Sequence, residues 1–491
     1  MGAVARLMGV CVVACGCSGG LGTVQWFVQF GEGVPEPDAA VVRVQIRAGS
    51  CDGPVLYDAV LADGQVPAMP SNLAPGVHAF SAFAINASCE VFARGCEVVA
   101  LSEATTVSVQ VTLTMAFTPA ACPPSHCDAG LCDGISDDWL EPSFSRRRFI
   151  VVDGSAISPD AGPVETFSGF PALVRLNGSR IDYARATGRD IRFYGSEGTP
   201  MSYEIERWDP EGESVAWVRL DNITAGSSQQ YFWMYYGDPV ADSAATPSAV
   251  WAPDYVAVFH MAETAPGSVL DSTMFDTDGE PAEGVTSGGF DRGIIERAVE
   301  SPVGRGYRFV NGQAVELSQH AARAPLHEGS WSFWLRRDWS DEGDEDYTIG
   351  GFATDTTGEI SFNWQGRDTS DDHFYARFPG PSTLNEPARG VVPEGQWKHI
   401  ALGWLRNDEL AVFVDGERQG VRPMNGLGAA ASAWCLGAVS YCDSSAFRDI
   451  SMPAAIDEVR FSSVRRSEWW VFADHLSMTD RLLTFGLEET R

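Results

Sequence analysis

The chain has 491 residues, with 66 Asp and Glu against 34 Lys and Arg, so its net charge is −32. A chain this negative repels phosphate backbones, and we therefore expect no nucleic-acid partner. Hydrophobic residues make up 44% of the chain and 50 residues are glycine, which favours a folded, turn-rich protein over a disordered one. At about 100–200 residues per domain, the length allows about three domains.

Residues 1–22 predict export and a lipid anchor. Arg6 precedes a short apolar run, and Val12-Val13-Ala14-Cys15 follows the pattern in which a signal is cut before a lipidated cysteine. The segment resembles bacterial lipoprotein signals, which implies a diacylglyceryl group on Cys15 that attaches the protein to lipid of the outer membrane or cell surface. Cys17 is the alternative anchor, and a buried strand at the start of a domain is the alternative for the segment. No later stretch reaches the roughly 18 apolar residues of a membrane span.

Residues 23–117 predict a small β-sandwich, because apolar and polar residues alternate around positions 42–47 and 107–113. Residues 118–136 predict a linker rich in Cys and Pro. Export makes disulfides the expected state of the six cysteines from Cys51 to Cys132, whose 15 possible connectivities stay open. A zinc site built from the linker cysteines and His126 is the alternative, but the spacing lacks the paired C-x₂-C of structural zinc sites.

Residues 137–249 predict a second β-sandwich module with six strand-like segments in order. The segments are Arg146–Val152, Phe170–Leu176, Asp190–Phe193, Tyr203–Trp208, Ala216–Val218 and Tyr235–Gly237. Together they resemble the bacterial domain-of-unknown-function family 2341, and the resemblance implies a β-rich extracellular module without an established activity.

Residues 250–491 predict a third β domain. Alternating runs occur at Val256–His260, Trp331–Arg336, Gln396–Leu402, Leu410–Gly416 and Ile456–Ser462. Their order resembles the laminin-G-like, concanavalin-A-like jelly roll, which stacks two antiparallel sheets. The whole chain is therefore expected to be all-β. Cys435 and Cys442 flank a short loop and are expected to form a disulfide, with two free thiols as the alternative.

The sequence gives little sign of catalysis, and we expect no enzyme. Motifs of metalloproteases, P-loop proteins and serine hydrolases are missing. Glycosidases with the concanavalin-A-like fold need two carboxylates across a cleft. Asp457 and Glu458 are adjacent, so a regular strand would point them to opposite faces.

Calcium is the expected metal. Asp271, Asp276, Asp278 and Glu280 lie in one loop, and calcium binds 6–8 oxygen ligands. The laminin-G-like resemblance implies a calcium site at the rim of the fold, with Asp271 as the first ligand and Asp457 as the second. A solvated acidic loop is the alternative, and the run at 341–346 is read as such a loop.

The leading hypothesis is a cell-surface lipoprotein that binds a glycan or another surface protein. A glycan-processing enzyme and a structural spacer without ligand are the rivals. Sugar stacking on tryptophan is one way to bind a glycan, although at strand spacing most of these residues belong to a core. The candidates are Trp331, Trp334, Trp364, Trp397, Trp404 and Trp434.

Overall fold

The computed structural model describes most of the chain. The described residues are 7–12, 24–35, 38–51, 53, 55–61, 73–102, 107–115, 122, 126–132, 139–157, 165–228, 230–251, 253–284, 292–310, 312–340, 346–354, 358–366, 373–378, 384–387, 389–424, 431–437 and 453–491. Strands hold 54% of the residues and helices 8%, so the fold class is all-β as predicted. No helix among the described residues is long and apolar enough to span a bilayer.

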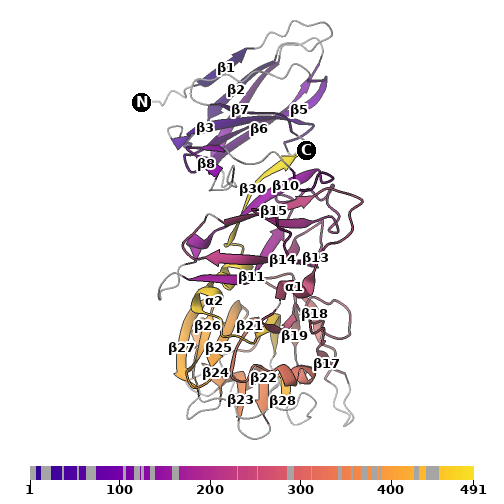
Figure 1. Cartoon of the computed structure of the whole chain (residues 1–491), viewed down its shortest axis with the longest axis vertical. Helices are drawn as coiled ribbons and strands as arrows, with labels where there is room; N and C mark the ends of the chain where they lie inside the picture. Colours follow the sequence, from indigo (N-terminus) through magenta and orange to yellow (C-terminus); the bar gives the residue numbers. More distant parts are fainter. Residues whose placement is uncertain are drawn as a thin grey trace.

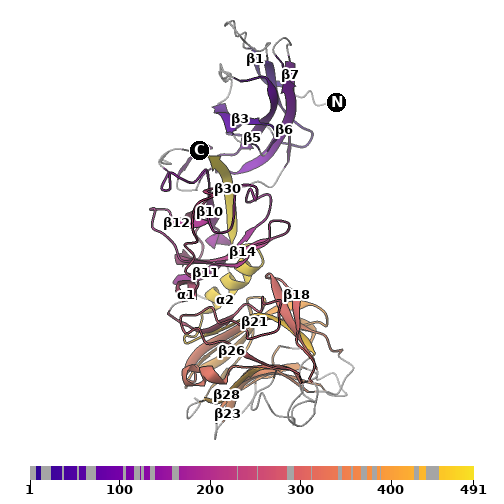
Figure 2. The ribbon, with the colours of Figure 1, turned by 90° about the vertical axis from the view of Figure 1, so that its right-hand side faces the viewer.

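Three β units follow one another along the long axis of the molecule (Figure 1). The first unit lies at one end and the third at the other, and the same order appears in the rotated view (Figure 2). The carboxyl terminus does not lie at the far end, because the last strand returns to the middle unit (Figure 1).

The first module is one seven-stranded sheet, and most of its strands share a common core. Trp26 packs edge-on against Phe80 at 5.1 Å between ring centroids, although their strands are not hydrogen-bonded neighbours. The sheet order is β1 (Leu7–Val12), β2 (Val24–Phe30), β7 (Val107–Met115), β6 (Val91–Leu101), β5 (Gly76–Ile85), β3 (Val41–Ala48) and β4 (Val55–Leu61).

The structure differs from the prediction at the start of this module. Leu7–Val12, expected within a removable signal, pairs with β2 as the outermost strand. The segment is therefore a strand, as in the alternative that the sequence left open, while lipidation and cleavage stay predictions. Cys15 and Cys17 lie outside the described residues.

The Cys-rich linker is bound to the first module by disulfides. Cys89 pairs with Cys127, and within the linker Cys122 pairs with Cys132. The third pair, Cys51–Cys96, joins the turn after β3 to β6. The six cysteines are therefore paired with one another as predicted, which leaves no free thiolate for the zinc alternative. Two short strands, β8 (Cys127–Asp128) and β9 (Leu131–Cys132), form the linker hairpin.

The second module is a two-layer sandwich with its core between the sheets. The three-stranded sheet has the order β11 (Thr166–Leu176), β14 (Ser214–Thr224) and β13 (Tyr203–Arg207). The four-stranded sheet has the order β12 (Arg192–Gly195), β15 (Gln230–Tyr236), β10 (Arg146–Val152) and β30 (Leu483–Thr490).

The fourth strand of that sheet corrects the predicted boundary of the third domain. We expected residues 250–491 to form the jelly roll alone, yet β30 pairs with β10, and the preceding helix α2 (Glu468–Met478) supplies Trp470, Ala473 and Leu476 to the core of the second module. The short helix α1 (Pro247–Trp251) ends the first part of this module.

The third module is the predicted jelly roll, with a core rich in aromatic residues between two sheets. One sheet contains β18 (Glu296–Glu300), β19 (Arg305–Phe309), β29 (Ala454–Ser462), β21 (Glu328–Arg337), β25 (Trp397–Leu405), β26 (Glu409–Val414) and β27 (Glu417–Pro423), and β16 (Tyr255–Phe259) also pairs with β29. The other contains β17 (Glu280–Ala282), β20 (Ala314–Glu316), β28 (Ala431–Leu436), β22 (Tyr347–Thr354), β23 (Gly358–Gln365) and β24 (His373–Arg377).

Candidate functional site

The second module covers part of the outer face of the eight-stranded sheet, and the contact is buried. Trp217 and Trp251 of the second module pack there with Val258 and Trp334 of the jelly roll and with Met478 of α2. Charged side chains lie within this apolar contact, where an unpaired charge is costly. We call Glu204, Glu206, His260, Glu458 and Arg460 the interface cluster.

Strand β13 contributes two carboxylates to the interface cluster. Because side chains alternate along a strand, Glu204 and Glu206 share one face while Tyr203 and Ile205 face the core of the second module. Trp217 on the neighbouring strand β14 donates from Nε1 to Glu206 Oε2 at 2.9 Å. Trp251 at the end of α1 donates from Nε1 to Glu204 Oε2 at 2.7 Å. The second module thus positions both carboxylates through indole N–H groups.

The jelly roll contributes the histidine and its partners. His260 follows β16, and its Nδ1 lies 2.8 Å from Glu458 Oε1 and 3.6 Å from Glu206 Oε2. Its Nε2 lies 3.3 Å from Glu204 Oε2. Arg460 donates to Glu458 Oε2 at 2.8 Å, and its guanidinium lies 4.2 Å from the centroid of the Trp217 ring. One imidazole therefore connects carboxylates from both modules.

Burial and charge shift the proton affinities within the interface cluster. Burial and the Glu458 carboxylate raise the pKa of Glu206 to about 8. Burial alone would lower the pKa of His260, but Glu458 and Glu204 raise it well above its ordinary value. Burial also opposes ionisation of Glu458, yet His260 and Arg460 bring its pKa below the ordinary range. Against the effect of burial, His260 also lowers the pKa of Glu204, so these shifts favour an imidazolium between ionised Glu204 and Glu458 and a neutral Glu206.

The charged network continues from Arg460 toward α2. Arg460 also donates to Asp474 Oδ1 at 3.0 Å, and His399 Nε2 lies 3.7 Å from Asp474 Oδ2. His399 stacks on His475 at 6.0 Å between ring centroids. Burial, His475 and Arg460 hold the pKa of His399 well below its ordinary value, so the long contact to Asp474 is not an ion pair.

Asp271, the first predicted calcium ligand, is a buried side chain that accepts hydrogen bonds from its surroundings. Its Oδ1 accepts from the backbone N–H groups of Val258 and Thr273, at 3.1 and 3.0 Å. Its Oδ2 accepts from Thr273 Oγ1 at 2.8 Å and from Thr277 N at 3.3 Å. This carboxylate fastens the acidic loop to β16.

Asp457, the second predicted ligand, is fully buried on β29, where Oδ1 accepts from Glu458 N at 2.9 Å. The expected alternation of Asp457 and Glu458 is interrupted by a bulge: Glu458 has a φ of 51°, and both carboxyl groups interact electrostatically with Glu206. Burial and Glu458 raise the pKa of Asp457 well above its ordinary value.

Within the described residues, neither predicted ligand belongs to a close group of metal-ligating atoms. The groups found there are Glu206–His260–Glu458 and three cysteines that are disulfide-bonded. Calcium binding at Asp271 and Asp457 stays a prediction.

The other predicted sites lie either in the core or outside the described residues. Cys435 is buried and disulfide-bonded, but its predicted partner Cys442 lies outside the described residues, as do positions 341–345 of the second acidic run. Five of the six candidate tryptophans lie in or beside the core with at most 3% exposure, and only Trp397 is half-buried. A stacking platform built from these tryptophans is not formed.

A row of polar side chains lies on the outer face of the six-stranded sheet. Phe362 and Trp364 of β23 face the core, so Ser361 and Asn363 point away from it, although both are buried, at 0% and 3% exposure. Thr348 Oγ1 donates to Asn363 Oδ1 at 3.0 Å, and Asn363 Nδ2 donates to Ser361 Oγ at 2.8 Å.

The row continues across β24. Ser361 Oγ donates to Glu359 Oε1 at 3.1 Å, and Arg377 pairs with the same carboxylate at 3.2 Å. Tyr375 lies opposite Asn363 in register and is half-buried, whereas Arg377 is exposed. We call Thr348, Ser361, Asn363, Glu359, Tyr375 and Arg377 the polar row.

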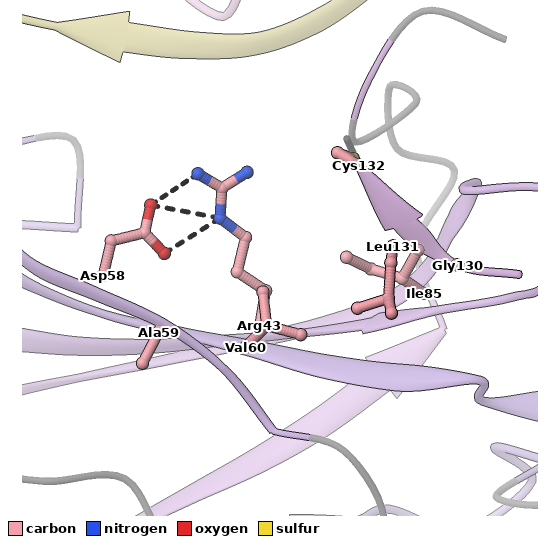
Figure 3. Close-up of a pocket in the computed structure, with 8 residues that line it drawn as sticks. All are labelled: Arg43, Asp58, Ala59, Val60, Ile85, Gly130, Leu131 and Cys132. Carbon is pink, nitrogen blue, oxygen red and sulfur yellow. Dashed lines mark hydrogen bonds and ion pairs between the residues drawn. The ribbon is translucent and has the colours of Figure 1, made fainter. Parts of the chain in front are cut away.

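A pocket of about 300 Å³ lies between β3, β4 and the linker hairpin. Ile85 and Leu131 line one side of it, and Arg43 and Asp58 pair with each other on the other side, where Val60 lies beside Arg43 (Figure 3). Both charged groups are therefore occupied by one another, and the pocket offers no free charge to a ligand.

Comparisons with known families follow the module order. Residues 187–276 match DUF2341, a domain of unknown function, and residues 309–471 match the concanavalin A-like lectin/glucanases superfamily. The chain carries both families in this order. The DUF2341 match contains Glu204, Glu206 and His260, and the concanavalin A-like match contains Glu458 and Arg460. The interface cluster therefore draws on both families.

Solved structures share only a general likeness with this chain. Domain 4 of AbnA, an extracellular arabinanase from Geobacillus stearothermophilus solved with arabinotriose, is 18% identical, with 45% of this chain and 97% of that chain covered and a TM-score of 0.34. The receptor binding domain of botulinum neurotoxin C/D mosaic serotype is 10% identical over 45% of this chain and 50% of that chain, at a TM-score of 0.33. This chain thus spans about half of that toxin domain. No curated protein matches the sequence.

Proposed function

We propose that the chain is a cell-surface protein that binds glycan through the polar row of the jelly roll. The observation that carries the proposal is the arrangement of hydrogen-bonding side chains beside a half-buried tyrosine. Glycan recognition uses planar polar groups for sugar hydroxyls and an aromatic face for the apolar side of the ring. Tyr375 and Arg377 on the edge strand β24 offer these groups together with Glu359 on the neighbouring strand β23.

The position of the polar row in the molecule supports this proposal. The second module and α2 cover part of the eight-stranded sheet, whereas the polar row lies on the other sheet of the jelly roll. The six-stranded sheet lies at the end of the molecule remote from the first module (Figure 1). A lipid at Cys15, or at Cys17, would place the anchor near the first module and the polar row far from the membrane.

A glycan array probed with the full chain tests the binding proposal. Tyr375→Ala and Arg377→Ala should each reduce binding at least tenfold, since each removes a group proposed to contact the sugar. Arg422→Ala, at an exposed position of β27 on the other sheet, is the matched control and should bind like the parent. Equal binding by all variants would contradict the polar row as the site, and an array without any signal would contradict glycan binding.

The membrane attachment has its own test. Replacing both Cys15 and Cys17 by Ser should release the protein from the membrane fraction, because the proposed lipid is then lost. Retention of the doubly substituted protein in the membrane fraction would contradict the anchor.

A further inference from the structure

Three ligand-type atoms meet in the interface cluster. His260 Nδ1, one oxygen of Glu206 and one oxygen of Glu458 all lie within 4.8 Å of one another. They come from three strands or strand ends in two modules, so the set exists only when the DUF2341 module and the jelly roll are docked. We propose that Glu206, His260 and Glu458 bind one divalent transition-metal ion, with zinc as the first candidate.

The groups around these atoms have the arrangement of a second ligand shell. A metal-binding histidine commonly donates its other ring N–H to a carboxylate, which fixes its orientation. Here Glu204 lies at 3.3 Å from His260 Nε2 and is itself held by Trp251 and by Ser272 Oγ at 2.7 Å. Trp217 holds Glu206, and Arg460 holds the second oxygen of Glu458. Each ligand-type side chain is therefore oriented by a neighbour.

An oxygen without a partner gives an independent sign of a missing ligand. Glu206 Oε1 is buried and has no hydrogen-bond partner in the described structure, although the side chain is only 1% exposed. Gly304, with a φ of 59°, lies beside it, and a Cβ at that position would approach Oε1 to 2.6 Å. Glycine therefore packs closely against this unsatisfied carboxylate oxygen, where a larger side chain would collide with it.

The charge of the buried groups also favours a cation. Five carboxyl groups lie within the network, and the cationic partners among its described buried residues are Arg460 and His260. The five are Glu204, Glu206, Asp457, Glu458 and Asp474. Protons on some carboxyl groups reduce this excess of negative charge. A metal ion bound by Glu206, His260 and Glu458 would neutralise it in place of those protons.

The donor types select the class of metal. One imidazole nitrogen with two carboxylates suits zinc and related transition metals, whereas calcium prefers oxygen ligands alone. The side chains of His260 and Glu204 keep 8% and 10% exposure, so one edge of the cluster reaches the surface. An ion would have access from that edge.

The test uses the full chain, stripped with a chelator and then dialysed against zinc chloride. We expect about one zinc per chain by elemental analysis and a melting temperature that rises with zinc and falls again with chelator. Glu206→Gln, which keeps the side-chain shape, should lose the zinc and the shift. His327→Ala, at an exposed histidine, should keep both and so controls for surface binding.

A second variant guards against misfolding of the first. Glu204→Gln leaves all three proposed ligands in place and should weaken zinc binding about 10–100-fold. Equal zinc content in the parent and in Glu206→Gln would place the metal elsewhere and overturn the proposal. Absence of both zinc and a melting shift in the parent would also overturn it and would leave the imidazolium held between carboxylates as the state of the interface.

Discussion

At the scale of single residues, the buried polar groups have two distinct roles. Some, such as Asp271, satisfy backbone N–H groups of a loop that has no regular structure of its own. Others, such as Arg460, neutralise carboxylates between modules. In both cases the polar atoms are paired because an unpaired buried group costs about 1–3 kcal/mol.

Because Asp271 accepts hydrogen bonds from the loop, its replacement should destabilise the protein. Asp271→Ala removes the acceptor of four hydrogen bonds and should lower the free energy of unfolding by about 2–4 kcal/mol, measured by urea denaturation. Asp276→Asn, at an exposed position of the same loop, should change it little. If Asp271→Ala is as stable as the parent, the loop does not depend on this carboxylate.

The same variants test the calcium prediction. Millimolar calcium should raise the melting temperature of the parent and have a weaker effect on Asp271→Ala. An unchanged melting curve of the parent would contradict a calcium site and support the solvated loop as the alternative.

The two buried histidines near α2 predict loss of stability in acid. Burial lowers the pKa of His475 to about 4, and burial also lowers that of His399. Both are neutral in the folded state but take up protons more readily when unfolded. The free energy of unfolding is therefore highest above the ordinary histidine pKa near 6.5. It falls as the pH drops toward 4, by about 3 kcal/mol for His475.

Urea denaturation between pH 7 and pH 4 measures this loss. His399→Leu should unfold with a shallower pH dependence than the parent, because one neutral buried histidine is gone. His327→Ala is the exposed control and should follow the parent. A pH dependence that is identical in all three proteins would show that His399 does not cause the acid sensitivity.

At the scale of elements, the carboxyl-terminal segment completes the second module. Strand β30 supplies one edge of the four-stranded sheet, and Glu488 and Glu489 pair with arginines of β10. Ser467 caps the start of helix α2, where its side chain accepts from Trp470 N, and the helix is buried on most sides between the two modules. The segment therefore belongs to the second module although it follows the jelly roll.

Removing this segment should unfold the second module selectively. Truncation after Ser467 exposes the edge of β10 and deletes Trp470, Leu476 and Phe485 from the core. We expect the DUF2341 region to become protease-sensitive, as read by limited proteolysis with mass spectrometry. Phe485→Ala offers a milder control and should cost about 3–5 kcal/mol without full loss of the module. Full protease resistance of the truncated chain would contradict the assignment.

The elements also show what the sequence can and cannot predict. Period-two alternation located several strands of the first module and the jelly roll, because each has one face in a core. Helix α2 was missed because residues on nearly all its sides are buried, which removes the 3.6-residue period that marks a surface helix. The Tyr-Glu-Ile-Glu run of β13 does show two carboxylates on one face, but their meeting with His260 depends on module docking. The bulge at Glu458 carries no sequence signal of its own.

At the scale of the whole molecule, the second module and the jelly roll share an interface that is both apolar and charged. The first module contacts the rest through the linker and through Leu487 of β30. We therefore expect calorimetry to show one transition for the two fused modules and another for the first module.

A disulfide variant identifies the transitions. Cys51→Ala with Cys96→Ala opens the crosslink within the first sheet and should destabilise that module by about 2–5 kcal/mol. Its transition should move to lower temperature while the other stays in place. A shift of both transitions together would mean that all three modules unfold as one unit.

The return of the last strand to β10 sets an order of events during synthesis. Arg148 and Gly486 are hydrogen-bonded but lie 338 positions apart, so the partner of β10 emerges from the ribosome only after the whole jelly roll. Until then β10 has an open edge, and the core around Ile150 lacks α2. Pairing over such a separation forms late, because the intervening chain must first be brought together. The second module is therefore completed only after the jelly roll, when α2 and β30 have been synthesised.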